Sequence, residues 1–194
     1  MRLYCATGNA GKLREFRLAG AHYPVEIEQA PDVREIPPCV EDGATFEENA
    51  VLKARHYAPR AGGLVFADDS GLSVEALGGA PGVYSARYAG PQATDEANNR
   101  LLLENLRGAR NRAARFVCAI ALVEGETLRG IFQGSVDGVI LDAPRGAGGF
   151  GYDPLFYSPQ LGCTFGEAGE EAKFAVSHRG QAMRAMLKEI FRVR

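Results

Sequence analysis

Segments that predict buried strands alternate with segments that predict helices along most of this 194-residue chain. The predicted strands are residues 3–6, 25–28, 64–67, 115–123, 127–133 and 136–141. The predicted helices are residues 12–21, a segment that begins with the capping box of Thr45 and Glu48 and ends at Pro59 or Gly62, a segment capped by Thr94 and a last one capped by Ser177. Because strands and helices are interleaved, the chain is of the α/β or the α+β class.

Composition and charge fit a single folded domain over residues 1–194. The chain is 46% hydrophobic, and at this length folding buries roughly 70% of the extended chain's surface. Its net charge of -2 gives no overall field that attracts nucleic acid or an anionic membrane. The longest unbroken apolar run, residues 116–123, is less than half of the roughly 20 residues that a membrane helix needs. We therefore expect no nucleic-acid partner and no membrane.

The cysteines indicate a reducing compartment. Cys5, Cys39, Cys118 and Cys163 are far apart, without a C-x-x-C pair or a nearby histidine cluster. This spacing argues against a zinc site and against a disulfide framework. We expect a cytoplasmic protein.

The first predicted turn has the elements of a phosphate site. The run Thr7-Gly8-Asn9-Ala10-Gly11-Lys12 joins a strand to a helix, and unpaired N–H groups at a helix N-terminus favour anions. The run lacks the G-x-x-x-x-G-K-[ST] pattern of a Walker P-loop. Taken alone, it fits a plain structural turn equally well.

The lysines single out three places in the chain. There are 18 arginines but only four lysines, Lys12, Lys53, Lys173 and Lys188. A lysine retained in such a chain suits a compact charge on a flexible stem, as in a phosphate contact. Lys188 lies among polar residues of a helix and needs no such role. The other three are candidates.

Two adjacent carboxylates follow an apolar predicted strand. Side chains of neighbouring residues in an extended chain point to opposite faces, so only one of Asp68 and Asp69 faces a given site. Glu41 precedes the helix capped by Thr45 and Lys53 lies within it, so both reach the same cleft if that helix borders this strand. Carboxylates without histidine or thiolate suit a hard cation such as magnesium, although ordinary loop and capping acids give the same pattern.

The motifs taken together resemble a known family. In chain order they are ATGNAGK, TFEENAVLKAR, ADDSGLSVEALGGAPGVYSARYAG, GGFGYDPLF and K-x-x-x-SHRGQA, and they extend over nearly the whole sequence. This chain resembles the inosine triphosphate pyrophosphatase (Ham1-like) family, whose members act on XTP, ITP and dITP. The resemblance implies hydrolysis of these triphosphates to the monophosphate plus pyrophosphate.

The resemblance also implies a fold, partners and a site. The fold would be mixed α/β, with a long central mixed sheet and two lobes around a nucleotide cleft, in a homodimer that requires Mg²⁺. The resemblance implies a phosphate loop formed by Thr7, Gly8, Asn9, Ala10, Gly11 and Lys12. It also implies that Glu41 and Asp69 hold the metal, that Asp69 activates water, that Lys53 contacts the phosphates and that Ser70 contacts the nucleotide. The base pocket that it implies consists of Phe150, Gly151, Tyr152, Asp153, Lys173, His178 and Arg179.

Elementary chemistry agrees with these roles. A 6-oxopurine presents an acceptor where adenine presents an amino donor, so donors from His178 and Arg179 would select the former. Phe150 would stack on the purine.

Two other interpretations stay open on the residues. One is a Maf-like nucleotide pyrophosphatase of different base specificity, against which the SHRG segment argues. The other is an RNA- or nucleotide-binding module that uses the arginine-rich residues 107–115, which the net charge of -2 and the lack of interleaved aromatic residues disfavour.

Overall fold

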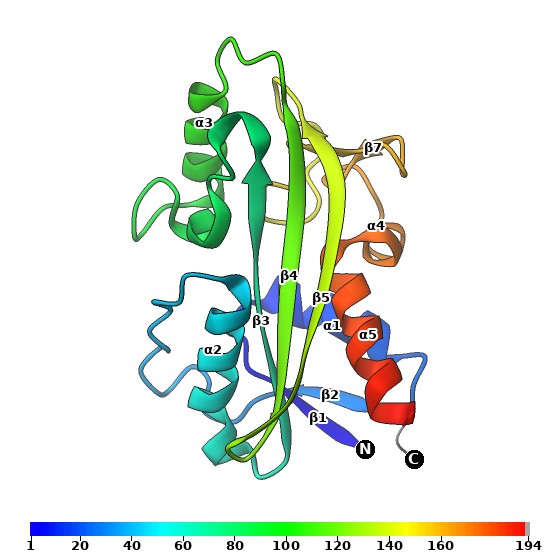
Figure 1. Ribbon diagram of the computed structural model, residues 1–194. Coiled ribbons are helices and arrows are strands. Elements are labelled where there is room, and N and C mark those ends of the chain that lie inside the picture. Colours follow the sequence, from blue (N-terminus) through cyan, green and yellow to red (C-terminus); the bar gives the residue numbers. More distant parts are fainter. Residues whose placement is uncertain (193–194) are drawn as a thin grey trace. The chain divides into compact units, whose positions relative to one another are not determined.

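A seven-stranded mixed sheet with flanking helices forms the fold, as the resemblance implies (Figure 1). The computed structural model describes residues 1–192. The strand order is β2-β1-β3-β4-β5-β6-β7. β1 (Arg2–Cys5) pairs in parallel with β2 (Glu26–Gln29) and with β3 (Leu64–Val74), whereas β6 (Phe156–Ser158) is antiparallel to β5 (Thr127–Ile140) and to β7 (Cys163–Thr164). β4 is Ala113–Glu124.

The chain forms two compact units. Unit 1 consists of Met1–Asp69, Cys118–Gly134 and the C-terminal segment that begins at His178. Its helices are α1 (Ala10–Gly20), α2 (Phe46–Ala61) and α5 (His178–Arg192). In Figure 1, α2 lies on one side of the unit 1 strands and α1 and α5 lie on the other. Its core is rich in alanine, which allows α2 to pack closely on β3 and β4.

Unit 2 consists of Ser70–Val117 and Ser135–Ser177. It contains the short 3-10 helices Glu75–Leu77 and Gly82–Arg87, helix α3 (Asp95–Asn105) and helix α4 (Glu170–Val176). Its core is more aromatic than that of unit 1, since the rings of Phe116, Phe156 and Phe165 pack together with centroids 4.5–6.0 Å apart. β6, β7 and α4 lack a clear hydrophobic period because they are short, and the sequence patterns did not predict them.

The predicted helix caps at Thr45 and Thr94 are confirmed. The Thr45 hydroxyl accepts from Glu48 N at 3.1 Å, and the Glu48 side chain accepts from Thr45 N. Thr94 accepts from Ala97 N at 3.2 Å. α2 continues through Pro59 and ends before Gly62, whose φ of +63° suits a glycine C-cap.

Two expected breaks in the strands do not occur. The predicted strand that ends before Asp68 continues through Asp68, Asp69, Ser70 and Gly71 to Val74. Carboxylates are tolerated inside a buried strand when cations pair with them, and both aspartates have lysine partners. The second expected break, at residues 134 and 135, is also absent, because β5 is one strand from Thr127 to Ile140.

Gly134 interrupts the apolar pattern of β5 because α5 lies against it. A Cβ at this position would stand 2.1 Å from the carbonyl oxygen of His178 and 2.7 Å from Ala182 N. Both atoms belong to the backbone of the first turns of α5, so neither can swing aside. The missing side chain at Gly134 therefore sets how closely the N-terminus of α5 approaches the sheet.

We expect Gly134→Ala to lower the melting temperature by about 2–12 °C, because overpacking a rigid contact costs about 1–3 kcal/mol. The matched control is Gly130→Ala on the same strand, where the nearest atoms belong to the ring of Phe132, a side chain that can turn. Differential scanning fluorimetry of both variants is the measurement. Equal melting temperatures for the two variants would contradict the role assigned to Gly134.

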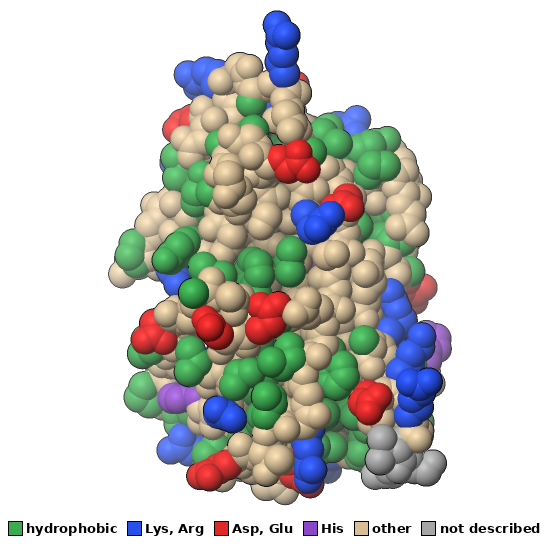
Figure 2. Space-filling view, in the orientation of Figure 1, with side chains coloured by type: hydrophobic (Ala, Val, Ile, Leu, Met, Phe, Trp, Pro, Cys, Tyr) green, Lys and Arg blue, Asp and Glu red, His purple; other side chains and the backbone are tan. Residues whose placement is uncertain are grey.

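The surface mixes charges of both signs. Figure 2 shows acidic and basic side chains interspersed, with hydrophobic ones beside acidic ones over α2. A shallow groove of about 380 Å³ lies there, lined by Gly43, Glu47, Glu48, Val51, Leu52 and Ile131. Among residues 1–192, no helix combines the length and the apolar character needed to cross a membrane.

Candidate active site

Asp69 lies at the centre of a cluster of polar side chains in unit 1. One carboxylate oxygen, Oδ1, lies 3.2 Å from Lys53 Nζ, and the other, Oδ2, accepts a hydrogen bond of 3.1 Å from Asn49 Nδ2. Lys53 Nζ also contacts Glu41 Oε2 at 3.0 Å. Asn49 and Lys53 are four residues apart on α2 and so lie on one face of that helix. The sequence-based expectation that Glu41, Lys53 and Asp69 come together is met by these contacts.

The environment of Asp69 raises its pKa above the ordinary 3.8. Burial, which disfavours the charged form, is the main cause, and the negative charge of Glu41 acts in the same direction. Lys53 and Lys12 partly oppose the shift. The pKa of Lys53 is also raised, since the nearby carboxylates outweigh its own burial. A carboxylate with a raised pKa is a better proton acceptor than an ordinary aspartate.

Asp68 lies in a separate, buried charge network. Its Oδ2 is 2.9 Å from Lys12 Nζ and 3.6 Å from Arg179 Nε. Arg179, only 3% exposed, donates from Nη1 to Glu15 Oε2 at 2.5 Å. The two adjacent aspartates therefore have different partners, Lys12 and Arg179 for Asp68 and Lys53 and Asn49 for Asp69, as their alternation along a strand predicts.

This network shifts the pKa of Asp68 in the opposite direction from that of Asp69. Burial acts to raise it, but Lys12, Arg179 and Lys53 together lower it well below the ordinary 3.8. A carboxylate with a lowered pKa contributes stability that is present at neutral pH and is lost as the pH falls through that pKa. The surroundings thus shift the pKa values of these two adjacent carboxylates in opposite directions.

The predicted phosphate loop consists of a turn and the first turn of α1. Asn9 is the N-cap, and its Oδ1 accepts from Lys12 N at 3.0 Å. The Thr7 hydroxyl accepts from Asn9 N, and the Thr7 carbonyl accepts from Gln29 Nε2 at 2.7 Å. These contacts fix the turn at the N-terminus of an 11-residue helix, where the helix dipole favours an anion.

In unit 2, Asp153 joins two other candidate residues. Its Oδ2 accepts from Lys173 Nζ at 2.5 Å and from Phe150 N at 2.8 Å. Lys173 Nζ also lies 4.9 Å from the centre of the Phe150 ring, within cation–π range. Both charged side chains of the pair are buried. This arrangement fixes the backbone at Phe150 and places one face of its ring against a cation.

The remaining candidates are placed as follows. Tyr152 belongs to the hydrophobic core of unit 2, and its hydroxyl donates to the Ser85 carbonyl at 2.8 Å. Ser70 is half-buried on β3, and Gly151 has a φ of +61°. His178 is buried at the first residue of α5.

Comparison with known proteins decides the family. A family model described as the Ham1 family matches residues 3–189. The chain belongs to the Ham1 family.

Curated relatives and solved structures match this chain over nearly its full length. The chain is 53% identical to a dITP/XTP pyrophosphatase from Exiguobacterium sp. strain AT1b, over 98% of this chain and 97% of that protein. It is 50% identical to a dITP/XTP pyrophosphatase from Thermus thermophilus, over 97% and 91%. The structure of the Ham1 protein from Staphylococcus aureus superimposes with a TM-score of 0.87 at 38% identity, over 100% of both chains. A HAM1 protein from Coxiella burnetii gives a TM-score of 0.87 at 40% identity, over 99% of both.

Two polar partners in this Ham1-family site were not identified from the sequence. Asn49, 1% exposed, holds Asp69, and Glu15 holds Arg179. A signal for Asn49 was present, because a polar residue on the inward stripe of a helix needs a buried partner. Glu15 follows Lys12 by three residues and thus shares a face of α1 with it. Its partner is 164 residues away in sequence, and no local pattern indicates it.

Proposed function

We propose that this chain hydrolyses non-canonical purine nucleoside triphosphates, XTP, ITP and dITP, to the monophosphate plus pyrophosphate. The observation that carries the proposal is the cluster in which Asp69 is held by Asn49 and Lys53 beside Glu41. The names of the full-length relatives, at about 50% identity, support the substrate class. In this proposal, residues 1–194 form one catalytic domain.

In the proposed reaction, Asp69 orients a water molecule and accepts its proton. Its raised pKa suits a general base, and Asn49 and Lys53 fix the direction of its carboxylate. Lys12, Lys53 and the turn at Thr7–Asn9 would bind the phosphate chain. The positive charges of the two lysines would offset the negative charge of the departing pyrophosphate. Holding water and phosphate in line supplies much of the rate.

The residues of unit 1 fit a magnesium ion. Glu41 and Asp69 both contact a single cation, Lys53 Nζ, so two carboxylates already converge on one positive charge. Magnesium takes one or two protein carboxylates and completes its shell with substrate phosphates. We propose Glu41 and Asp69 as its ligands. When bound, Mg²⁺ would neutralise charge on the phosphate oxygens.

Recognition of the base is assigned to Ser70, to Phe150, Gly151, Tyr152, Asp153 and Lys173, and to His178 and Arg179. Phe150 would stack on the purine, since its ring is fixed by the Asp153 contact and by Lys173. His178 and Arg179 would donate to the 6-oxo group and exclude adenine. Glu15 holds the plane of the Arg179 guanidinium, so its donors have a fixed direction.

The proposed function predicts a defined product and base preference. We expect purified protein with Mg²⁺ to release pyrophosphate from ITP, XTP and dITP at least roughly 100-fold more efficiently than from ATP, because a site with mispaired buried donors rejects the wrong base strongly. Pyrophosphate and orthophosphate are measured separately, with GTP and TTP as further substrates. Equal turnover of ATP and ITP contradicts the base assignment. Preference for TTP favours the Maf-like alternative, and orthophosphate as first product contradicts the cleavage site.

A homodimer in the cytoplasm completes the proposal. The family resemblance supports the dimer, and the four cysteines, which are all free thiols, are compatible with a reducing compartment. Light scattering coupled to gel filtration measures the mass directly, with about 42 kDa expected for two copies of the 20.8 kDa chain.

A further inference from the structure

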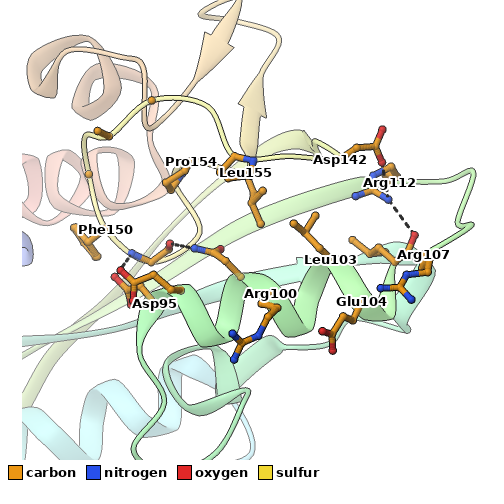
Figure 3. Close-up of a pocket in the computed structure, with 18 of the residues that line it drawn as sticks. Asp95, Arg100, Leu103, Glu104, Arg107, Arg112, Asp142, Phe150, Pro154 and Leu155 are labelled. Atoms are coloured by element: carbon orange, nitrogen blue, oxygen red, sulfur yellow. Dashed lines mark hydrogen bonds and ion pairs between the residues drawn. The ribbon is translucent and has the colours of Figure 1, made fainter.

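The segment that carries Phe150 is poor in side chains that could fix it by packing. Residues 146–151 include four glycines, Gly146, Gly148, Gly149 and Gly151. The segment also lines a cavity of about 960 Å³, whose opposite wall is α3 (Figure 3). Gly148 N donates to the Gly166 carbonyl at 2.9 Å. Because space rather than packed side chains separates α3 from much of this segment, hydrogen bonds rather than packing link its Phe150 end to α3.

Two side chains of α3 provide such hydrogen bonds. Asp95 Oδ2 accepts from Gly151 N at 2.6 Å, and Asn99 Nδ2 donates to Gly151 O at 2.9 Å. In Figure 3, the interaction of Asp95 reaches from the start of the helix to the backbone next to Phe150. Asp95 and Asn99 are four residues apart and therefore lie on one face of the helix. Together they hold the N–H and the C=O of the same residue.

The two contacts act together with Asp153. The two peptide groups that flank the Phe150 Cα are both held, since Asp153 accepts from Phe150 N and Asp95 accepts from Gly151 N. Gly149 cannot carry a side chain here, because a Cβ would stand 2.1 Å from Asp153 Oδ2. The backbone on both sides of the Phe150 side chain is thus hydrogen-bonded to carboxylates.

We propose that Asp95 and Asn99 are positioning residues that set the Phe150 ring for the purine base. The inference rests on the proposed function, because it assigns them a role only through Phe150. In this proposal neither residue contacts the substrate. Their loss should therefore weaken the binding of ligands that contain a base and leave the binding of the phosphate groups unchanged.

The test compares Asp95→Ala, Asn99→Ala and the double variant with the control Glu96→Ala. Glu96 lies in the same first turn of α3 and lines the same cavity, but its hydrogen bonds are to Thr94 and to its own backbone. Titration calorimetry measures the Kd of IMP and of pyrophosphate, and initial rates give kcat and KM for ITP. We expect each single variant to raise the Kd of IMP and the KM of ITP roughly fivefold, as for one lost hydrogen bond. The Kd of pyrophosphate should stay within about twofold.

The conservative variant Asp95→Asn keeps an acceptor oxygen and should restore IMP binding to near the wild-type value. If the Kd values of IMP and pyrophosphate rise together, or if Glu96→Ala weakens IMP as much as Asn99→Ala does, the positioning role is wrong. The unmodified protein reports on the proposed function separately. If it neither binds IMP nor hydrolyses ITP, that function fails; if it does both and the variants match it, only the present inference fails.

Discussion

Asp69→Asn is expected to reduce kcat for ITP by more than roughly 100-fold, because general-base catalysis by a positioned side chain contributes about 10²–10⁴. The change keeps the size of the side chain and removes its ability to accept a proton. Folding should be retained, since asparagine can still accept from Asn49 Nδ2, which holds Asp69 Oδ2 in the structure. Pyrophosphate release under saturating ITP is the measurement, with circular dichroism to confirm the fold.

Asp42→Asn is the matched control for this loss. Asp42 is an exposed neighbour of Glu41, and the same chemical change there should leave kcat within about twofold. The pH profile gives a second readout. Because the base must be ionised, kcat/KM should fall as the solution is acidified through the pKa of Asp69, and the residual activity of Asp69→Asn should lack this fall. If Asp69→Asn retains a rate within threefold of the unmodified protein, Asp69 takes no part in the chemistry.

Arg179→Met is expected to have the largest effect on stability. The substitution keeps a long side chain but leaves Glu15 and Asp68, both buried, without the cation between them. Removing one partner from a buried ion pair costs about 3–5 kcal/mol. In a chain of this size that corresponds to a fall in melting temperature of about 10 °C. Thermal unfolding followed by circular dichroism measures it.

Two further variants separate this effect from a general sensitivity to loss of arginine. Arg55→Met on the exposed side of α2 should change the free energy of unfolding by less than about 0.5 kcal/mol. Combining Glu15→Gln with Arg179→Met should recover part of the lost stability, because Glu15 then no longer leaves an unpaired buried charge and Asp68 keeps its contact with Lys12. Below its melting temperature, Arg179→Met should also show a smaller preference for ITP over ATP. An unchanged preference would contradict the donor role of Arg179, and an unchanged melting temperature would contradict its structural role.

The sequence predicted the elements well where the local signal was strong. The caps at Thr45 and Thr94 are formed as expected, because a cap depends on residues only three positions apart. The strand through Asp68 and Asp69 was predicted too short, since the cations that make burial of both carboxylates tolerable come from α1, α2 and α5. Local patterns contain no information about such distant partners.

The candidate site shows the same division between local and distant information. The meeting of Glu41, Lys53 and Asp69 could be anticipated from a helix placed beside a strand. The contact of Gly134 with α5, by contrast, appeared in the sequence only as an interruption of the apolar pattern. The roles of the site residues stay predictions, and Asp69→Asn and Arg179→Met test two of them.

The buried network of Lys12, Glu15, Asp68 and Arg179 has a consequence for how this family can vary. The four side chains carry two positive and two negative formal charges, so the set is neutral. Any single change of charge leaves a net charge in the interior of unit 1, whereas a paired change preserves neutrality. We therefore expect that natural variation at these four positions, distributed over α1, β3 and α5, occurs as coordinated exchanges, with the pair Glu15 and Arg179 changing together.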